Sequence, residues 1–192
     1  MTHAIFELDQ IAGLPLWAQV LIASRIARRA ALWLPLDTPT SVREALLAGC
    51  DAADRCAISG QRSTEDVQAM QIAANQTTSH VVQPAIDAMY YAADAAHAAE
   101  SSLDFEAAER ACTQSVLKAL ASAAEMATLN PLQVRIFAAA DLDQLRFACN
   151  EIGINRYDGL GTAVIGRLFP VTAPAPDDIR PQKPTDPQDE YR

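Results

Sequence analysis

Apolar residues recur at three- and four-residue steps along most of the first 169 residues, which is the spacing of one face of an α-helix. The pattern is clearest over residues 104–127, where one face collects Phe105, Ala108, Cys112, Val116, Leu120, Ala123 and Ala127. No stretch alternates polar and apolar positions for long enough to predict a β-sheet. The chain is therefore predicted to be all-α and to form a single helical bundle.

Residues that start and stop helices divide this pattern into about six helices. Ser41 with Glu44 has the spacing of a capping box, in which two side chains satisfy free backbone N–H groups, and Ser63 opens a later helix in the same way. Gly60 and Gly153 follow the ends of periodic segments, where a left-handed residue is favoured. The predicted helices cover residues 15–33, 41–57, 64–100 with a kink or a break at Pro84, 104–127 and 132–151, and a short last helix lies within residues 159–168.

Two of these boundaries stay open. Pro84 either kinks one long helix or separates two helices, because proline lacks the backbone donor and clashes with the preceding turn. A break near Asp141 is also compatible with the pattern.

The last residues have a different composition. From Pro170 onward the chain holds six of its eleven prolines, interspersed with Asp and Glu. Such a segment buries too little apolar area to offset the entropy of ordering it. We therefore predict one all-helical domain over residues 1–169 and a Pro-rich, acidic, extended tail over residues 170–192.

Composition and charge narrow the classes of partner. The 38 alanines against 11 aromatic residues favour helices that pack closely. A net charge of −9 disfavours nucleic acid and anionic membranes as partners.

The apolar run over residues 14–36 is interrupted by Arg25, Arg28 and Arg29, so it does not predict a membrane span. Four cysteines without paired spacing, and a start without a basic leader, predict reduced thiols and a cytoplasmic location.

The stretch GLGTAVIG, which begins at Gly159, resembles a nucleotide-binding loop at first sight. A dinucleotide-binding loop needs a third glycine three residues after Gly161, but that position is Val164. Such a loop also follows a β-strand, and the sequence predicts no strand before Gly159. We therefore interpret Gly159 as part of a turn, and Gly161 and Gly166 as positions that let the last helix pack closely. No cofactor is predicted.

One polar cluster lies on a predicted helix. Tyr90, His97 and Glu100 share a face of the helix over residues 85–100, where a His–Glu pair could orient a proton carrier or hold part of a metal site. The alternative is that Tyr90 and His97 are semi-buried structural residues solvated by the glutamate. The spacing matches no metal motif, and we predict no catalytic or metal-ligating residue.

Arg25, Arg28 and Arg29 form the most concentrated basic stretch, in a segment without acidic residues. They could dock an acidic partner or a phosphate, or they could complement the helix dipole while their stems cover apolar surface. Asp141 and the acidic residues near it are interpreted as a solvated face.

The segments ALWLP, SVREALLAGCDAADRCAISG and AIDAMYYAADAAHAAE, with the motif Tyr91-Ala92-Ala93, resemble the Ala-rich, all-helical immunity proteins of bacterial polymorphic toxin systems. The resemblance covers the chain from Ala30 to about Glu125. It implies a cytoplasmic protein that binds and blocks a toxin and has no catalysis of its own. Two other hypotheses stay open: a small helical ligand-binding protein or enzyme that uses His97 and Glu100, and a structural homo-oligomer subunit.

Overall fold

The computed structural model describes residues 11–75, 94–95, 97–100, 104–126, 131–168 and 171. Six labelled helices run through these residues, and no strand occurs in them: α2 (Leu16–Leu32), α3 (Thr40–Ser59), α4 (Thr64–Asn75), α6 (Phe105–Met126), α7 (Pro131–Ile152) and α8 (Gly161–Ile165). Residues 94–95 and 97–100 are also helical. The prediction of an all-α bundle is confirmed. The tail predicted over residues 170–192 lies outside the described residues, apart from Val171.

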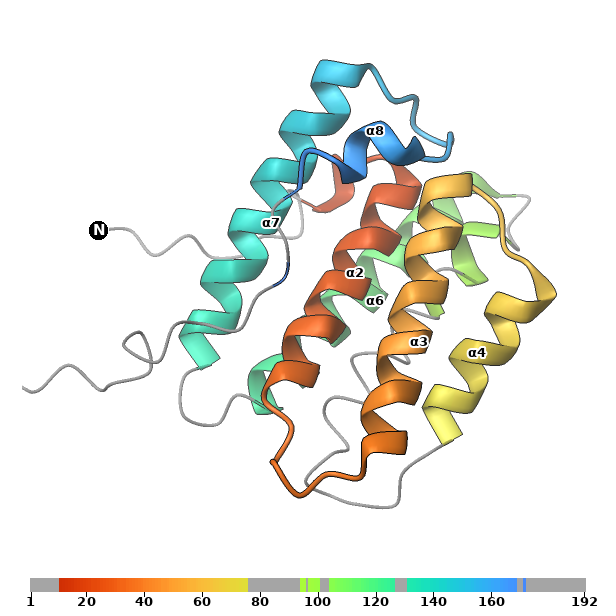
Figure 1. Ribbon diagram of the computed structural model, residues 1–192. Helices are drawn as coiled ribbons and strands as arrows, with labels where there is room; N and C mark the ends of the chain where they lie inside the picture. Colours follow the sequence, from red (N-terminus) through yellow and green to blue (C-terminus); the bar gives the residue numbers. More distant parts are fainter. Residues whose placement is uncertain are drawn as a thin grey trace, which may run out of the picture.

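Helix α2 is the centre of the bundle. It packs against α3, α6 and α7, while α4 covers α3 and α8 bridges the ends of α3 and α7 (Figure 1). All residues of α2 are buried except Arg28 and Leu32. An alanine-rich central helix suits this position, because small side chains let neighbouring helices approach on several sides.

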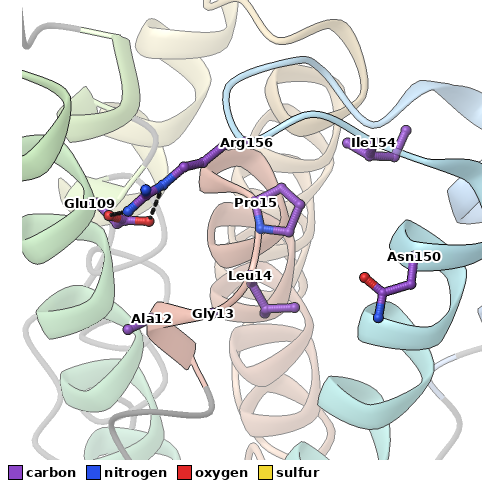
Figure 2. A pocket seen from close by; sticks show the side chains of 8 residues that line it. All are labelled: Ala12, Gly13, Leu14, Pro15, Glu109, Asn150, Ile154 and Arg156. Carbon is purple, nitrogen blue, oxygen red and sulfur yellow. Dashed lines mark hydrogen bonds and ion pairs between the residues drawn. The ribbon is translucent and has the colours of Figure 1, made fainter.

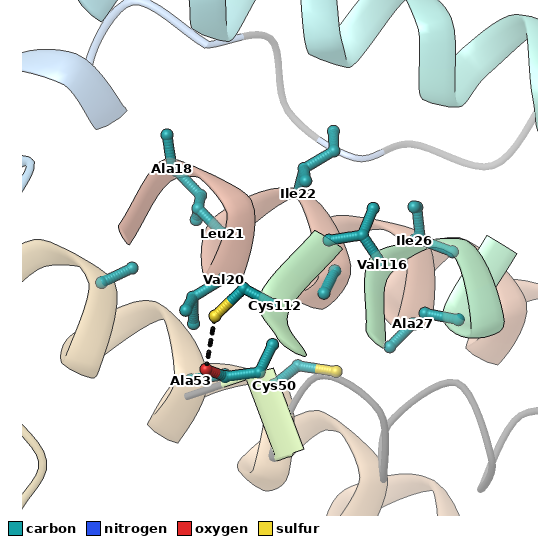
Figure 3. Close-up of a cluster of buried hydrophobic side chains, with 14 of the residues drawn as sticks. Ala18, Val20, Leu21, Ile22, Ile26, Ala27, Cys50, Ala53, Cys112 and Val116 are labelled. Atoms are coloured by element: carbon teal, nitrogen blue, oxygen red, sulfur yellow. Dashed lines mark hydrogen bonds between the residues drawn. The ribbon is translucent and has the colours of Figure 1, made fainter. Parts of the chain in front are cut away.

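The interior is built from alanine and short aliphatic side chains. Figure 3 shows Val20, Ile22 and Ile26 of α2 beside Cys112 and Val116 of α6, with residues of α3 next to them. The four cysteines are free thiols in this core: Cys50, Cys56, Cys112 and Cys149. Burial raises the pKa of Cys50 and Cys112 to about 12, so these thiols stay protonated and behave as small apolar groups.

A buried polar contact joins α2 to each of its three neighbours. The Ser24 hydroxyl donates to the Cys50 carbonyl of α3 at 3.1 Å, and the Thr113 hydroxyl of α6 donates to Gln19 Oε1 at 2.9 Å. Asp141 of α7 accepts from two arginines of α2. Because buried polar groups need specific partners, these contacts select one packing arrangement among helices with similar apolar faces.

The helix ends confirm part of the sequence analysis. Ser63 Oγ accepts from the Asp66 N–H at 3.1 Å and so caps α4, and Gly60 ends α3 in a left-handed conformation with φ 69°. The capping box predicted at Ser41 is wrong. Helix α3 begins at Thr40 after Pro39 and has no side-chain cap, because the proline already fixes the turn that Ser41 was expected to start.

Two predictions about the helical faces are wrong. Phe105, predicted on the apolar face of its helix, is 49% exposed; it is the first residue of α6 and its ring contacts that of Tyr157 in the loop after α7. Helix α7 continues without a break through Asp141, which is buried and ion-paired rather than solvated. No helix in the described ranges is long and apolar enough to cross a membrane.

Gly60 and Gly159 form a close backbone crossing. A Cβ built on Gly159 would lie 2.5 Å from the Gly60 nitrogen, and the Leu160 N–H donates to the Ala57 carbonyl at 2.9 Å. Gly161 and Gly166, predicted to allow close packing, have no neighbouring atom inside 3.4 Å of an added Cβ. Gly161 instead has a φ of 66°, a left-handed conformation that favours glycine over other residues. The glycines are structural, as predicted, but the tight contact occurs at Gly159.

Candidate functional site

Two of the three arginines in the basic stretch turn into the bundle. Arg25 and Arg29 are buried, and their guanidinium groups bind Asp141 of α7 at 2.7 Å and at 2.8–2.9 Å. The guanidinium of Arg29 also lies over the Phe137 ring, 4.8 Å from its centroid. Asp141 of the same chain is therefore the acidic partner of both Arg25 and Arg29.

The third arginine pairs with α3. Arg28 Nη2 lies 2.6 Å from Asp51 Oδ1 and 2.6 Å from Asp54 Oδ2. Burial opposes the charge of Arg28, but the two carboxylates outweigh it and raise its pKa above the ordinary value. The stretch therefore joins α2 to α3 and α7 through ion pairs.

The predicted His–Glu cluster is partly described. Tyr90 lies outside the described residues. His97 is exposed, so the interpretation of this side chain as semi-buried is wrong. Arg62, in the turn before α4, contacts His97 Nδ1 at 2.6 Å and forms an ion pair with Glu100. The structure thus brings His97 and Glu100 together through one guanidinium at the surface.

A pocket of about 400 Å³ opens where the segment before α2, the beginning of α6, and the end of α7 with the loop after it meet (Figure 2). It is lined by Ala12, Gly13, Leu14, Pro15, Glu109, Asn150, Ile154 and Arg156. The loop after α7 is held over this pocket because the Leu16 N–H donates to the Arg156 carbonyl at 2.8 Å. The pocket therefore has a fixed backbone frame.

Arg156 and Glu109 form the polar wall of the pocket. Arg156 Nε lies 2.9 Å from Glu109 Oε1, and Arg156 Nη2 binds the second carboxylate oxygen. The hydrogen bond and the negative charge of Glu109 both raise the pKa of Arg156. The Glu109 side chain is only 11% exposed, whereas that of Arg156 is 57% exposed. The pair thus presents a cation at the surface that its carboxylate holds in place.

Two aromatic rings continue this surface beyond the pocket. The Phe105 and Tyr157 rings have centroids 4.3 Å apart and a tilt of 31°, and the Arg156 guanidinium lies 5.8 Å from the Tyr157 centroid. Phe105 is 49% exposed and Tyr157 is 39% exposed. We call Phe105, Glu109, Arg156 and Tyr157, together with the adjoining pocket, the aromatic–arginine face.

Sequence reasoning missed the aromatic–arginine face. Its residues come from α6 and from the loop after α7, and neither segment has a recognisable motif. The one available signal was Phe105, a large apolar residue at the first position of a helix, where it has no preceding turn to pack against.

The described part of the chain has no group of three or more His, Cys, Asp and Glu side chains arranged to hold a metal ion. Comparisons of the sequence and structure with protein-family models, with curated proteins and with solved structures find no match.

Proposed function

We propose that the protein is a non-catalytic interaction protein, immunity-like in its mode of action, which binds a protein partner through the aromatic–arginine face. The observation that carries this proposal is the exposed Phe105–Tyr157 pair beside the bidentate Arg156–Glu109 pair, at the rim of a pocket. Aromatic residues and arginine are the residue types that contribute most of the binding energy at protein interfaces.

The arrangement also suits a partner because it is pre-organised. The Glu109 carboxylate holds the guanidinium, and the stacked rings restrict each other, so little side-chain entropy remains to be lost on binding. A pocket of about 400 Å³ has room for one or two side chains of the partner. The net charge of −9 favours approach by a basic protein.

Truncating the aromatic pair tests the proposal. We expect the double variant Phe105→Ala, Tyr157→Ala to weaken partner binding by about thirtyfold or more, because each ring is a central apolar contact. The wild type, this variant and Leu36→Ala would be used as baits in extracts of the native host, followed by quantitative mass spectrometry. Leu36 is a matched control because it is fully exposed in the loop between α2 and α3.

The proposal requires a protein that the wild type and Leu36→Ala both capture and the double variant does not. Isothermal titration with that purified protein then gives the change in affinity. Equal capture by all three baits would exclude the aromatic–arginine face as the binding surface.

A second candidate function is ligand binding or catalysis that uses His97 and Glu100. It is favoured by one observation, the shared contact of these two side chains with Arg62. Under our proposal, His97→Ala changes the melting temperature by about 2 °C at most, because exposed substitutions have small effects, and leaves partner binding unchanged. Thermal unfolding and the same titration measure both quantities. Loss of partner binding at an unchanged melting temperature would place the binding surface at His97 and contradict our proposal.

A further inference from the structure

The pocket beside Arg156 combines aliphatic walls with one nearly buried carboxylate. Pro15 and Ile154 contribute apolar surface to its lining, and Glu109 contributes a side chain that is 11% exposed. Figure 2 shows Glu109 of α6 on one side of the pocket and Asn150 of α7 on the other, with the segment before α2 between them. A lining of this kind suits a side chain that has an apolar stem and a polar head group.

The Glu109 carboxylate has the capacity to accept further hydrogen bonds. Among the described residues, each of its two oxygens accepts one hydrogen bond, and both bonds come from Arg156. A carboxylate offers about four acceptor positions, so others remain beside the pocket. The protein already contains a carboxylate that two guanidinium groups share, since Asp141 accepts from both Arg25 and Arg29. A second guanidinium at Glu109 would repeat that arrangement.

The charges around the pocket favour a cation over an anion. Residues 104–110 and 150–158 contain the lining residues of α6, of α7 and of the loop after α7. They hold five acidic residues and two arginines: Asp104, Glu106, Glu109, Glu151 and Asp158, and Arg110 and Arg156. Glu151 is paired with Arg167, outside these segments, and the remaining side of the pocket, residues 11–15, has no charged side chain. Four carboxylates against two arginines give these segments a negative potential, which attracts a cation.

We propose that the pocket receives an arginine side chain of the protein partner, whose guanidinium group shares the Glu109 carboxylate with Arg156. This inference rests on the proposed function, because the pocket belongs to the aromatic–arginine face, and it adds the chemistry of the partner residue. The aliphatic stem of the arginine packs against Pro15 and Ile154. Arginine suits the pocket better than lysine, since its guanidinium is more weakly hydrated and its planar fork matches a carboxylate.

Titration with blocked amino acids tests the inference without the partner. The probes are N-acetyl-arginine methylamide, its citrulline analogue, which has the same shape without the charge, and its glutamate analogue. Amide NMR spectra of the full chain should show saturable shifts at Gly13, Asn150 and Ile154 with the arginine probe, at a dissociation constant of about 1 mM. The citrulline probe should bind about tenfold more weakly or less, because it lacks the charge.

Two variants locate the bound probe. Glu109→Gln keeps the size of the side chain and removes its charge, so it should weaken binding of the arginine probe about tenfold or more. Ala12→Trp fills the pocket from an exposed lining residue and should abolish binding. Ala121→Trp is the matched control, since Ala121 is exposed on α6 twelve residues beyond Glu109, and it should bind as the wild type does. Circular dichroism verifies that all three variants are folded.

The results separate the arginine site from the proposed function. An arginine probe that does not bind, that binds no more tightly than the citrulline probe, or that is unaffected by Glu109→Gln or by Ala12→Trp would overturn the inference. Tighter binding of the glutamate probe would also overturn it, since Arg156 would then recognise an anion. In each of these cases the proposed function stands if the double variant Phe105→Ala, Tyr157→Ala still loses the partner. If that variant captures the same proteins as the wild type while the arginine probe binds, the proposed function fails and the arginine site remains.

Discussion

Replacing Asp141 by alanine should lower the free energy of unfolding by about 3–5 kcal/mol, the largest loss we expect from removing one side chain of this protein. The carboxylate is 2% exposed and accepts hydrogen bonds from both Arg25 and Arg29. Without it, the guanidinium groups of two buried arginines would remain in the interior. Two unpaired buried charges cost more than the lost hydrogen bonds alone.

Urea unfolding followed by circular dichroism measures this loss, and the melting temperature should fall by about 10 °C or more. The control is Glu106→Ala, which removes a carboxylate that is 82% exposed and lies 3.7 Å from Arg110 on the same helix. That surface pair is worth under about 1 kcal/mol. If the two variants lose the same stability, the Arg25–Asp141–Arg29 cluster does not hold α2 against α7.

A companion variant separates two contributions to the free energy of unfolding: the loss caused by leaving buried charges unpaired, and the net contribution of the intact cluster. Replacing all three charged groups by apolar residues, as Arg25→Met, Arg29→Met and Asp141→Leu, should restore most of the stability that Asp141→Ala loses, because no buried charge is then left unpaired. The cluster would then be understood as selecting the packing of α7 rather than as a net source of stability.

Gly159→Ala should lower the free energy of unfolding by about 3 kcal/mol, through crowding rather than through backbone strain. Its Cβ would lie 2.5 Å from the Gly60 nitrogen, 2.6 Å from the Ser59 carbonyl carbon and 2.8 Å from the Ile58 oxygen. These are backbone atoms at the end of α3, so no side-chain rotation relieves the contact. The loop after α7 must move away from α3 and lose the hydrogen bond from Leu160.

Two neighbouring glycines provide matched controls for the same substitution. Gly166→Ala meets no atom closer than 3.5 Å and has an ordinary φ, so its stability should stay within about 0.5 kcal/mol of the wild type. Gly161→Ala meets no atom within 4 Å but needs a φ of 66°, so it should cost about 1 kcal/mol from backbone strain alone. Equal stability of Gly159→Ala and Gly166→Ala would show that the crossing opens without cost.

The role of these glycines was partly predictable from the sequence. The glycines were correctly interpreted as structural, since no strand precedes them and the nucleotide-binding spacing is incomplete. Which glycine makes the close contact was not predictable, because the clash at Gly159 comes from Gly60, about a hundred residues earlier in the chain. Likewise the pairing of Arg25 with Asp141 joins residues 116 positions apart.

The sequence by itself determined the all-helical class, the ends of α3 and α7 at Gly60 and Gly153, and most of the buried face of α6. These features depend on periodicity, propensity and caps, which are energies between residues a few positions apart. Only the tertiary structure decided that Arg25 and Arg29 point inward, that Asp141 is buried, and that Phe105 and Tyr157 meet beside Arg156. Each of these depends on which helices pack side by side and on how each helix is rotated about its axis. In an alanine-rich chain many helix faces have nearly the same apolar character. Specific polar and steric contacts between residues far apart in the sequence therefore determine which faces meet.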